Sequence, residues 1–227
     1  MAEEKKKKSV YFVIDASGSM QGKRAGIINT AMRGVFENVI PEIIAEQDTK
    51  VELSLAILLF SDRFNDGVKW ILPKTLMEDI ANSKVEWTDI PDTDFYGGTP
   101  TGQGILAVIN DCRHTSNGEI DLSAAAPAII LISDGDANTG TPSYEEVLEY
   151  ENPDNVNYSL PFCYSVRVAI GIDVTDECRK RLKMFGQVSK KMAERGLEPY
   201  YDHSDKYDDK LIEIIKSVTK LTSIYKS

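Results

Sequence analysis

The stretch VYFVIDASGSM, residues 10–20, carries the pattern that decides the fold. Its first five residues are apolar without interruption and rich in β-branched and aromatic types, which is typical of a strand buried on both faces. The apolar run stops at Asp15, and two hydroxyl residues, Ser17 and Ser19, follow at alternate positions. An acid and two hydroxyls directly after a buried strand indicate a ligand site at the strand's carboxyl end.

Similar strands recur along the chain and alternate with segments of helical periodicity. This alternation predicts an α/β fold: a Rossmann-like, doubly wound, mostly parallel central sheet with helices on both faces and a short antiparallel edge strand. Expected strands are 9–15, 51–60, 68–72, 127–133, 162–170 and 197–201, and expected helices are 24–46, 75–82, 101–113, 143–150, 175–195 and 205–224. Pro41 is expected to kink or divide the first helix, and Gly186 to break the helix over 175–195.

Length and composition restrict the classes of partner. The chain has 227 residues, of which 42% are hydrophobic, enough for one sizeable domain; we expect a basic tail over 1–8 and a single domain over 9–224. Lys and Arg number 26 against 36 Asp and Glu, a net charge of −10. Such a charge disfavours nucleic acid and anionic membranes as partners, because both would repel the protein. It is compatible with a bound cation.

The cysteines and the N-terminus predict a cytoplasmic protein. Three cysteines, Cys112, Cys163 and Cys178, form no CxxC pair and are expected to be reduced thiols, with one disulfide as the alternative. The apolar run after the N-terminal lysines is too short for a signal peptide or a membrane span, and no later stretch reaches the length of a bilayer crossing.

A second acid follows a second buried strand. Asp134 comes directly after the strand over 127–133, as Asp15 comes after the strand over 9–15. In an open α/β sheet the carboxyl ends of parallel strands share one edge, where ligands bind, so we expect both carboxylates there.

Three hydroxyls are expected to join the two carboxylates. Side chains alternate along an extended chain, so Ser17 and Ser19 project to the same side as Asp15, and Gly18 lets the backbone curl. Thr99, in FYGGTPTG, adds a hydroxyl after two glycines. Hydroxyl and carboxylate oxygens are hard ligands suited to Mg²⁺, with Mn²⁺ or Ca²⁺ possible. A cation held mainly by hydroxyls keeps positive charge, which a partner protein's Asp or Glu would satisfy.

These residues resemble the metal-ion-dependent adhesion site of von Willebrand factor A domains. Residues 15–19, DASGS, look like the family's DxSxS motif, while Thr99 in GGTPTG and Asp134 in SDGD match its other two elements. The resemblance covers residues 9 to about 220. It implies a Rossmann-like fold, a divalent cation, and protein binding without catalysis, with the serines and threonine as direct ligands and the aspartates often acting through water. Short intracellular bacterial members, including tellurite-resistance-type proteins, are similar in length.

Alternative interpretations compete for the same residues. The serines could cap the following helix, and Thr101 could replace Thr99 as the metal hydroxyl. The segment DGDANTGTPSYE puts acids and an amide at positions 1, 3, 5 and 12 of an EF-hand-like calcium loop, although position 6 is Thr139 where that loop needs glycine. As an enzyme, the protein would be a Mg²⁺-dependent phosphatase of haloacid-dehalogenase type with Asp15 as nucleophile, but Ser17 stands where such enzymes need a general acid.

Overall fold

The computed structural model describes residues 5–47, 50–113, 126–203 and 213–219. Within these residues a six-stranded sheet has the order β3-β2-β1-β4-β5-β6. The strands are β1 (Lys6–Asp15), β2 (Val51–Phe60), β3 (Val68–Leu76), β4 (Ala128–Ser133), β5 (Val166–Ile172) and β6 (Tyr200–His203). Only β3, at one edge, runs antiparallel to its neighbour; the other pairs in this sheet are parallel. The predicted Rossmann-like, mostly parallel sheet with an antiparallel edge strand is therefore confirmed.

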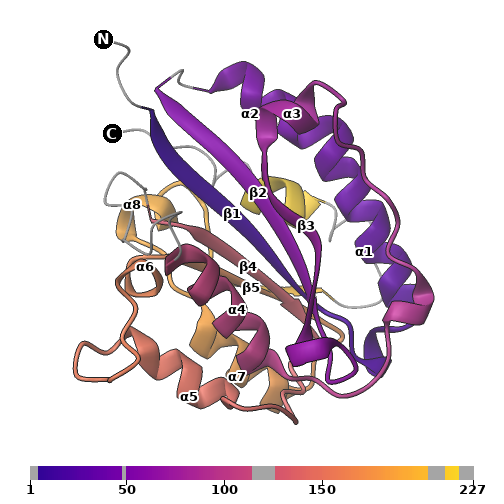
Figure 1. The fold of residues 1–227 in the computed structure, drawn as a ribbon, viewed down its shortest axis with the longest axis vertical. Helices are drawn as coiled ribbons and strands as arrows, with labels where there is room; N and C mark the ends of the chain where they lie inside the picture. Colours follow the sequence, from indigo (N-terminus) through magenta and orange to yellow (C-terminus); the bar gives the residue numbers. More distant parts are fainter. Residues whose placement is uncertain (1–4, 48–49, 114–125, 204–212, 220–227) are drawn as a thin grey trace.

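Helices cover both faces of the sheet (Figure 1). The first face carries α1 (Lys23–Gly34), α2 (Ile40–Glu46), α3 (Met77–Ala81) and the helical segment 213–219. The second face carries α4 (Thr101–Arg113), α5 (Tyr144–Leu148), α6 (Leu160–Cys163) and α7 (Asp176–Phe185). The apolar run of β1 serves both layers, because Phe12 and Ile14 pack into the first and Tyr11 and Val13 into the second.

The long first helix contains an irregularity ahead of its proline. A π-helical turn, Val35–Val39, separates α1 from α2, and Pro41 follows in the first turn of α2. Proline lacks an N–H group and its ring clashes with the carbonyl four residues earlier, so a wider turn before it lets the helix continue without a sharp break. The prediction that Pro41 divides this helix is confirmed in that form.

Some predicted boundaries were wrong. β1 begins at Lys6, and Lys8 is buried within it, which lowers the pKa of its ammonium group to about 8. The expected strand 162–170 begins only at Val166, because α6 (Leu160–Cys163) precedes it; the Ser159 side chain caps this helix by accepting from the Phe162 N–H.

The C-terminal elements largely follow the prediction. α7 ends at Phe185 before Gly186, and α8 (Lys190–Ala193) follows, so the expected break is present. Of the predicted helix 205–224, the described part, 213–219, is helical; the remainder lies outside the described residues.

The strand register brings the expected site residues to one level. Ile14 of β1 pairs with Ile132 of β4, so the next residues, Asp15 and Ser133, lie side by side at the carboxyl ends of these central strands. Asp15 is also paired with Phe60, the last residue of β2. The loops that leave these strands therefore meet at the carboxyl end of the sheet, here called the crest.

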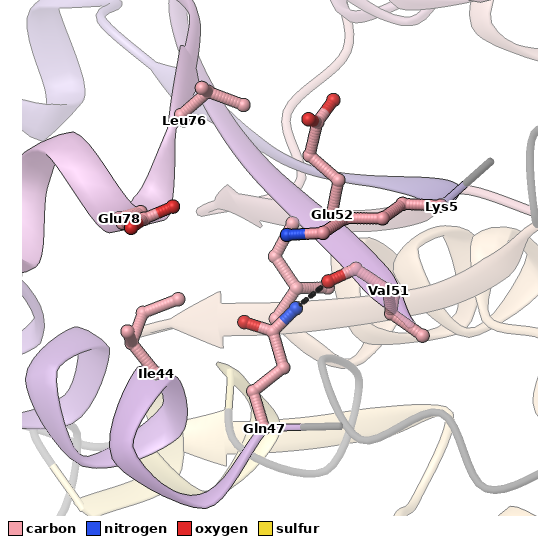
Figure 2. Close-up of a pocket in the computed structure, with 8 residues that line it drawn as sticks. Lys5, Ile44, Gln47, Val51, Glu52, Leu76 and Glu78 are labelled. Atoms are coloured by element: carbon pink, nitrogen blue, oxygen red, sulfur yellow. Dashed lines mark hydrogen bonds between the residues drawn. The ribbon is translucent and has the colours of Figure 1, made fainter. Parts of the chain in front are cut away.

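A pocket of about 180 Å³ lies at the opposite end of the sheet. It is lined by residues near the start of β1 and β2 and the end of α2, among them Lys5, Ile44, Gln47 and Glu52. Figure 2 shows the Gln47 amide nitrogen donating to the Val51 carbonyl across this pocket. The pocket is therefore separate from the crest.

Candidate metal centre

Asp15 is fully buried at the end of β1, and both oxygens of its carboxylate accept hydrogen bonds. The Ser17 backbone N–H donates to Oδ1 at 2.8 Å, and the Ser133 hydroxyl donates to Oδ2 at 2.6 Å. Burial raises the pKa of Asp15 to about 7; the Ser133 hydrogen bond opposes this rise and the nearby Asp134 adds to it. The carboxylate is thus firmly oriented but costly to ionise without a cation.

The two serines of the DASGS segment lie close together. Their hydroxyl oxygens are 3.0 Å apart, with Ser17 buried and Ser19 exposed. Between them, the Gly18 N–H donates to the Gly97 carbonyl at 3.0 Å, which joins this loop to the one that carries Thr99. Ser17 makes no side-chain capping hydrogen bond, and Gly22 occupies the N-cap of α1. The interpretation of the serines as helix caps was therefore wrong.

Thr99 is held in place by its backbone. Its N–H donates to Asn138 Oδ1 at 3.0 Å, and its carbonyl accepts from the N–H groups of Asn138 and Thr101. The preceding Gly98 N–H donates to Asp62 Oδ1 at 2.8 Å. Thr101, the first residue of α4, has a buried hydroxyl oxygen without a hydrogen-bond partner among the described residues, so it stays an alternative ligand.

Asp134 follows β4 and pairs with an arginine. Its side chain is largely buried, and Oδ2 lies 3.2 Å from Nη1 of Arg24, in the first turn of α1. The second oxygen, Oδ1, accepts the Asp136 N–H at 3.3 Å. The same Arg24 nitrogen donates to the Ser19 carbonyl at 2.8 Å. Arg24 thereby links Asp134 to the DASGS loop.

The structure thus joins the five predicted site residues in one network at the crest. Asp15 connects to Ser17 and, through Ser133, to the end of β4, directly before Asp134. The donor set fits a hard divalent cation, because it consists of carboxylate and hydroxyl oxygens. Asp15 is buried, and the groups that donate to its carboxylate, the Ser17 N–H and the Ser133 hydroxyl, carry no charge to balance its ionised form. Residues Asp15, Ser17, Ser19, Thr99 and Asp134 would hold such an ion.

The EF-hand-like alternative was wrong. Asp136 is exposed, the Asn138 side-chain oxygen is bonded to Thr99, and Glu145 lies in α5 with its carboxylate 3.5 Å from Arg181. Glu145 stands in the first turn of α5, which starts with a capping box between Ser143 and Glu146. Throughout the described ranges, no group of three or more His, Cys, Asp or Glu side chains is placed to hold a metal ion.

Three supporting residues were not predicted from the sequence. Ser133 orients Asp15, Asn138 fixes Thr99, and Arg24 pairs with Asp134. Ser133 and Arg24 make these contacts across 118 and 110 residues, so local sequence carries no signal for them. Asn138 has a weak one, since it lies four residues after Asp134 in a polar loop.

Across the four described ranges, none of the helices combines the length and apolarity that a bilayer crossing requires.

Comparison with known proteins connects the chain to one family. The family model for the von Willebrand factor type A domain matches residues 9–160. Inter-alpha-trypsin inhibitor heavy chain H3 of Bos taurus is 29% identical over 142 residues, which cover 63% of this chain and 14% of that protein. Inter alpha-trypsin inhibitor heavy chain 4 of Mus musculus is 27% identical over 169 residues, 74% of this chain and 16% of the relative. The chain therefore corresponds to about one seventh of these relatives' length.

Solved structures share the fold at low sequence identity. Proximal thread matrix protein 1 from the mussel byssus is described with a zinc-occupied MIDAS motif, the abbreviation for metal-ion-dependent adhesion site. It has a TM-score of 0.61 and 16% identity, over 96% of this chain and 49% of that one. The pilus adhesin SpaC from Lactobacillus rhamnosus GG has a TM-score of 0.60 and 15% identity, over 96% of this chain and 30% of that one. The vWF domain of the pilus tip protein Mfa5 from Porphyromonas gingivalis has a TM-score of 0.54 and 12% identity, over 97% of both chains.

Proposed function

Because this chain belongs to the von Willebrand factor type A domain family, we propose that it is a divalent-cation-dependent protein-binding module. Its cation is Mg²⁺, with Mn²⁺ or Ca²⁺ as possible substitutes, and a partner protein completes the coordination with an Asp or Glu side chain. The module acts as an adapter or regulatory subunit and does not itself catalyse a reaction.

The hydroxyl pair is the observation on which this proposal rests. The Ser17 and Ser19 oxygens lie 3.0 Å apart and carry no formal charge, and Ser19 is exposed at the crest. Two neutral oxygens beside one buried carboxylate suit a small hard cation and leave a side open to solvent. When bound, the cation would supply an electrophilic centre for an external carboxylate.

The charge balance supports a binding role. Asp15 contributes one negative charge, whereas the charge of Asp134 is offset by Arg24 at 3.2 Å. A divalent cation held here retains positive charge, because the serine and threonine hydroxyls add none. An acidic side chain from another protein would satisfy that charge, which is a reason for binding rather than turnover.

The phosphatase alternative gains no support. The position two residues after Asp15 is Ser17, which cannot act as a general acid at neutral pH, and the family match favours a binding domain. The predicted cytoplasmic location and the similarity to bacterial tellurite-resistance-type proteins stay predictions, since the relatives above include a pilus adhesin and a byssus protein.

Cation binding is tested first on the purified protein. We expect isothermal titration calorimetry to show Mg²⁺ binding that is lost in Asp15→Ala and Thr99→Ala, with the circular dichroism spectrum of each variant unchanged. Thr101→Ala decides between the two threonines, because it should retain binding if Thr99 is the ligand. A wild-type protein that binds neither Mg²⁺, Mn²⁺, Ca²⁺ nor Zn²⁺ would refute the proposal.

Capture of a partner protein tests the second part of the proposal, in which an Asp or Glu side chain of that partner completes the cation's coordination. Protein immobilised with Mg²⁺ is exposed to native lysate, and bound proteins are eluted with EDTA. A partner identified in this way is purified, and its acidic residues are replaced by amides one at a time. We expect one such replacement to abolish binding to the wild-type protein. Binding that survives EDTA and the Asp15→Ala variant would show that the interaction does not use the cation.

A further inference from the structure

Arg24 connects three segments of the crest. Its Nη1 atom donates to the Ser19 carbonyl at 2.8 Å and lies 3.2 Å from Asp134 Oδ2, while its Nε atom lies 3.2 Å from Asp173 Oδ2. The side chains of Arg24, Asp134 and Asp173 are 24%, 10% and 19% exposed. At this degree of burial, water and salt screen the ion pairs less than they screen surface pairs.

Asp173 is built into this arrangement. It directly follows β5 and has φ of +52°, the left-handed region that residues other than glycine seldom adopt. Its N–H donates to the His203 carbonyl at the end of β6 at 2.9 Å, which holds this backbone conformation. The backbone of Asp173 is thus held in place, and its carboxylate is a second anchor for the guanidinium, so Arg24 lies between the ends of β4 and β5.

This arrangement engages both oxygens of Asp134. Oδ2 faces Arg24, and Oδ1 accepts the Asp136 N–H at 3.3 Å. Each carboxylate oxygen keeps a further lone pair beside one hydrogen bond, so the opposition comes from the Arg24 pair, which holds Oδ2 while a cation would draw the carboxylate toward itself. The arginine thus opposes direct coordination by Asp134 and lowers the negative charge that a cation would meet.

We infer that Arg24 is a positioning residue of the metal site: it keeps Asp134 out of the cation's inner coordination shell. The site then binds the cation less tightly and binds a partner's carboxylate more tightly. This inference rests on the proposed function. Without Arg24, Asp134 would be free to bind the cation directly. The cation would be held more tightly, and its remaining charge would attract an external acid less strongly.

The test compares Arg24→Gln with Arg33→Gln. Arg33 lies on the same helix and pairs with Asp89 at 2.6 Å, but both of these side chains are about half exposed. The control variant thus removes the same charge and one ion pair without changing the crest contacts. We expect Arg24→Gln to bind Mg²⁺ about tenfold more tightly by calorimetry, since it loses a nearby positive charge. Arg33→Gln should match the wild type.

A second measurement reports the coordination itself. With Mn²⁺ as the probe, water-proton relaxation counts the water molecules on the bound ion, and added acetate should displace one of them. We expect Arg24→Gln to hold one fewer water than the wild type and to bind acetate about tenfold more weakly. Mg²⁺ affinity that is unchanged or reduced in Arg24→Gln, or an unchanged water count, would overturn the inference while leaving the proposed function intact.

Asp173→Asn provides a variant with the opposite expected sign. Without Asp173, the guanidinium has Asp134 as its remaining carboxylate among these contacts, so Mg²⁺ should bind more weakly than in the wild type. In the Arg24→Gln background the same change should have a much smaller effect, because the shared arginine is gone. Equal effects of Asp173→Asn in both backgrounds would overturn the inference. If wild type and Arg33→Gln both fail to bind Mg²⁺ and Mn²⁺, the proposed function fails, and this inference with it.

Discussion

The Ser133 hydroxyl donates a 2.6 Å hydrogen bond to Asp15 Oδ2, and the two residues lie 118 positions apart in the sequence. They are neighbours because β1 and β4 are parallel and in register at the carboxyl end of the sheet. Ser133 in turn accepts the Gly135 N–H at 2.9 Å, so its orientation is set by the loop that carries Asp134. The Asp15 carboxylate is thus oriented by Ser133, whose hydroxyl is held by the backbone of the loop that carries Asp134.

Ser133→Ala should weaken Mg²⁺ binding roughly 10- to 100-fold, because residues that orient a ligand contribute about that much to metal affinity. Calorimetry measures the change. The matched control is Ser165→Ala, which removes another buried serine hydroxyl, one that donates to the Phe162 carbonyl at 2.6 Å. Equal losses of Mg²⁺ affinity in both variants would show that the effect comes from general loosening and not from Asp15.

The raised pKa of Asp15 predicts how the stability of the cation-free protein depends on pH. Its ordinary value is 3.8 and burial raises it to about 7. Between these values the unfolded chain ionises this group while the folded protein keeps it protonated, so folding stability falls as pH rises through the window. In EDTA, the stability of Asp15→Asn relative to wild type should therefore rise by roughly 1–4 kcal/mol as pH rises from about 4 to above 7.

Thermal denaturation of both proteins in EDTA across this pH range measures that difference directly. Carboxylates distant from Asp15 contribute equally in wild type and variant, so the difference between the two curves reports on Asp15 and the adjoining Asp134. With saturating Mg²⁺ above pH 7 the order should reverse, because the cation binds the ionised carboxylate and the amide offers a weaker ligand. If the stability difference between the two proteins stays constant from low to neutral pH, burial does not raise the pKa of Asp15.

Removal of the cation should destabilise the wild-type protein. At a Mg²⁺ concentration about 100-fold above the dissociation constant, binding to the folded state alone contributes roughly 2.7 kcal/mol, or about 5–10 °C in the melting temperature of a domain this size. Differential scanning fluorimetry with Mg²⁺ and then EDTA measures this shift. The Ser17→Ala/Ser19→Ala double variant should lose the shift. A full shift in that variant would place the cation elsewhere.

Gly97→Ala should distort the crest. Gly97 has φ of +93°, and an added Cβ atom would lie 2.3 Å from Asp62 Oδ1 and 2.6 Å from Arg63 Cγ. We expect a loss of about 1–3 kcal/mol in unfolding free energy together with weaker Mg²⁺ binding, since Thr99 lies two residues on. Gly26→Ala is the control: it lies in α1 with nothing within 4 Å of the added atom and should stabilise by about 0.5–1 kcal/mol. Intact Mg²⁺ binding in a destabilised Gly97→Ala would separate this loop from the site.

Much of the fold could be predicted because its central strands are long apolar runs. The segments around Phe12, Leu58 and Leu131 lack polar interruption, which is the pattern of strands covered on both faces, and the structure places them in the middle of the sheet. Errors came where local capping competed with strand patterning. The segment around Phe162 is apolar enough for a strand, yet Ser159 and Pro161 start a short helix there.

The candidate site likewise has residues that the sequence predicted and supporting contacts that it did not. Asp15, Ser17, Ser19, Thr99 and Asp134 each stand beside a recognisable strand end or helix start, so the sequence alone suggested them as a set. Their supporting contacts had no such signal. Arg24 lies in an ordinary amphipathic helix, and nothing near it in the sequence predicts a pair with Asp134 or Asp173.

The sequence by itself determined the parallel α/β sheet and which oxygen-bearing residues lie at its carboxyl edge, because the apolar period and the strand ends are local properties of the chain. Only the tertiary structure decided how those oxygens are charged and oriented. The hydrogen bond from Ser133 to Asp15 and the ion pair between Arg24 and Asp134 each join residues more than 100 positions apart. Such contacts exist only once the strands have paired in register.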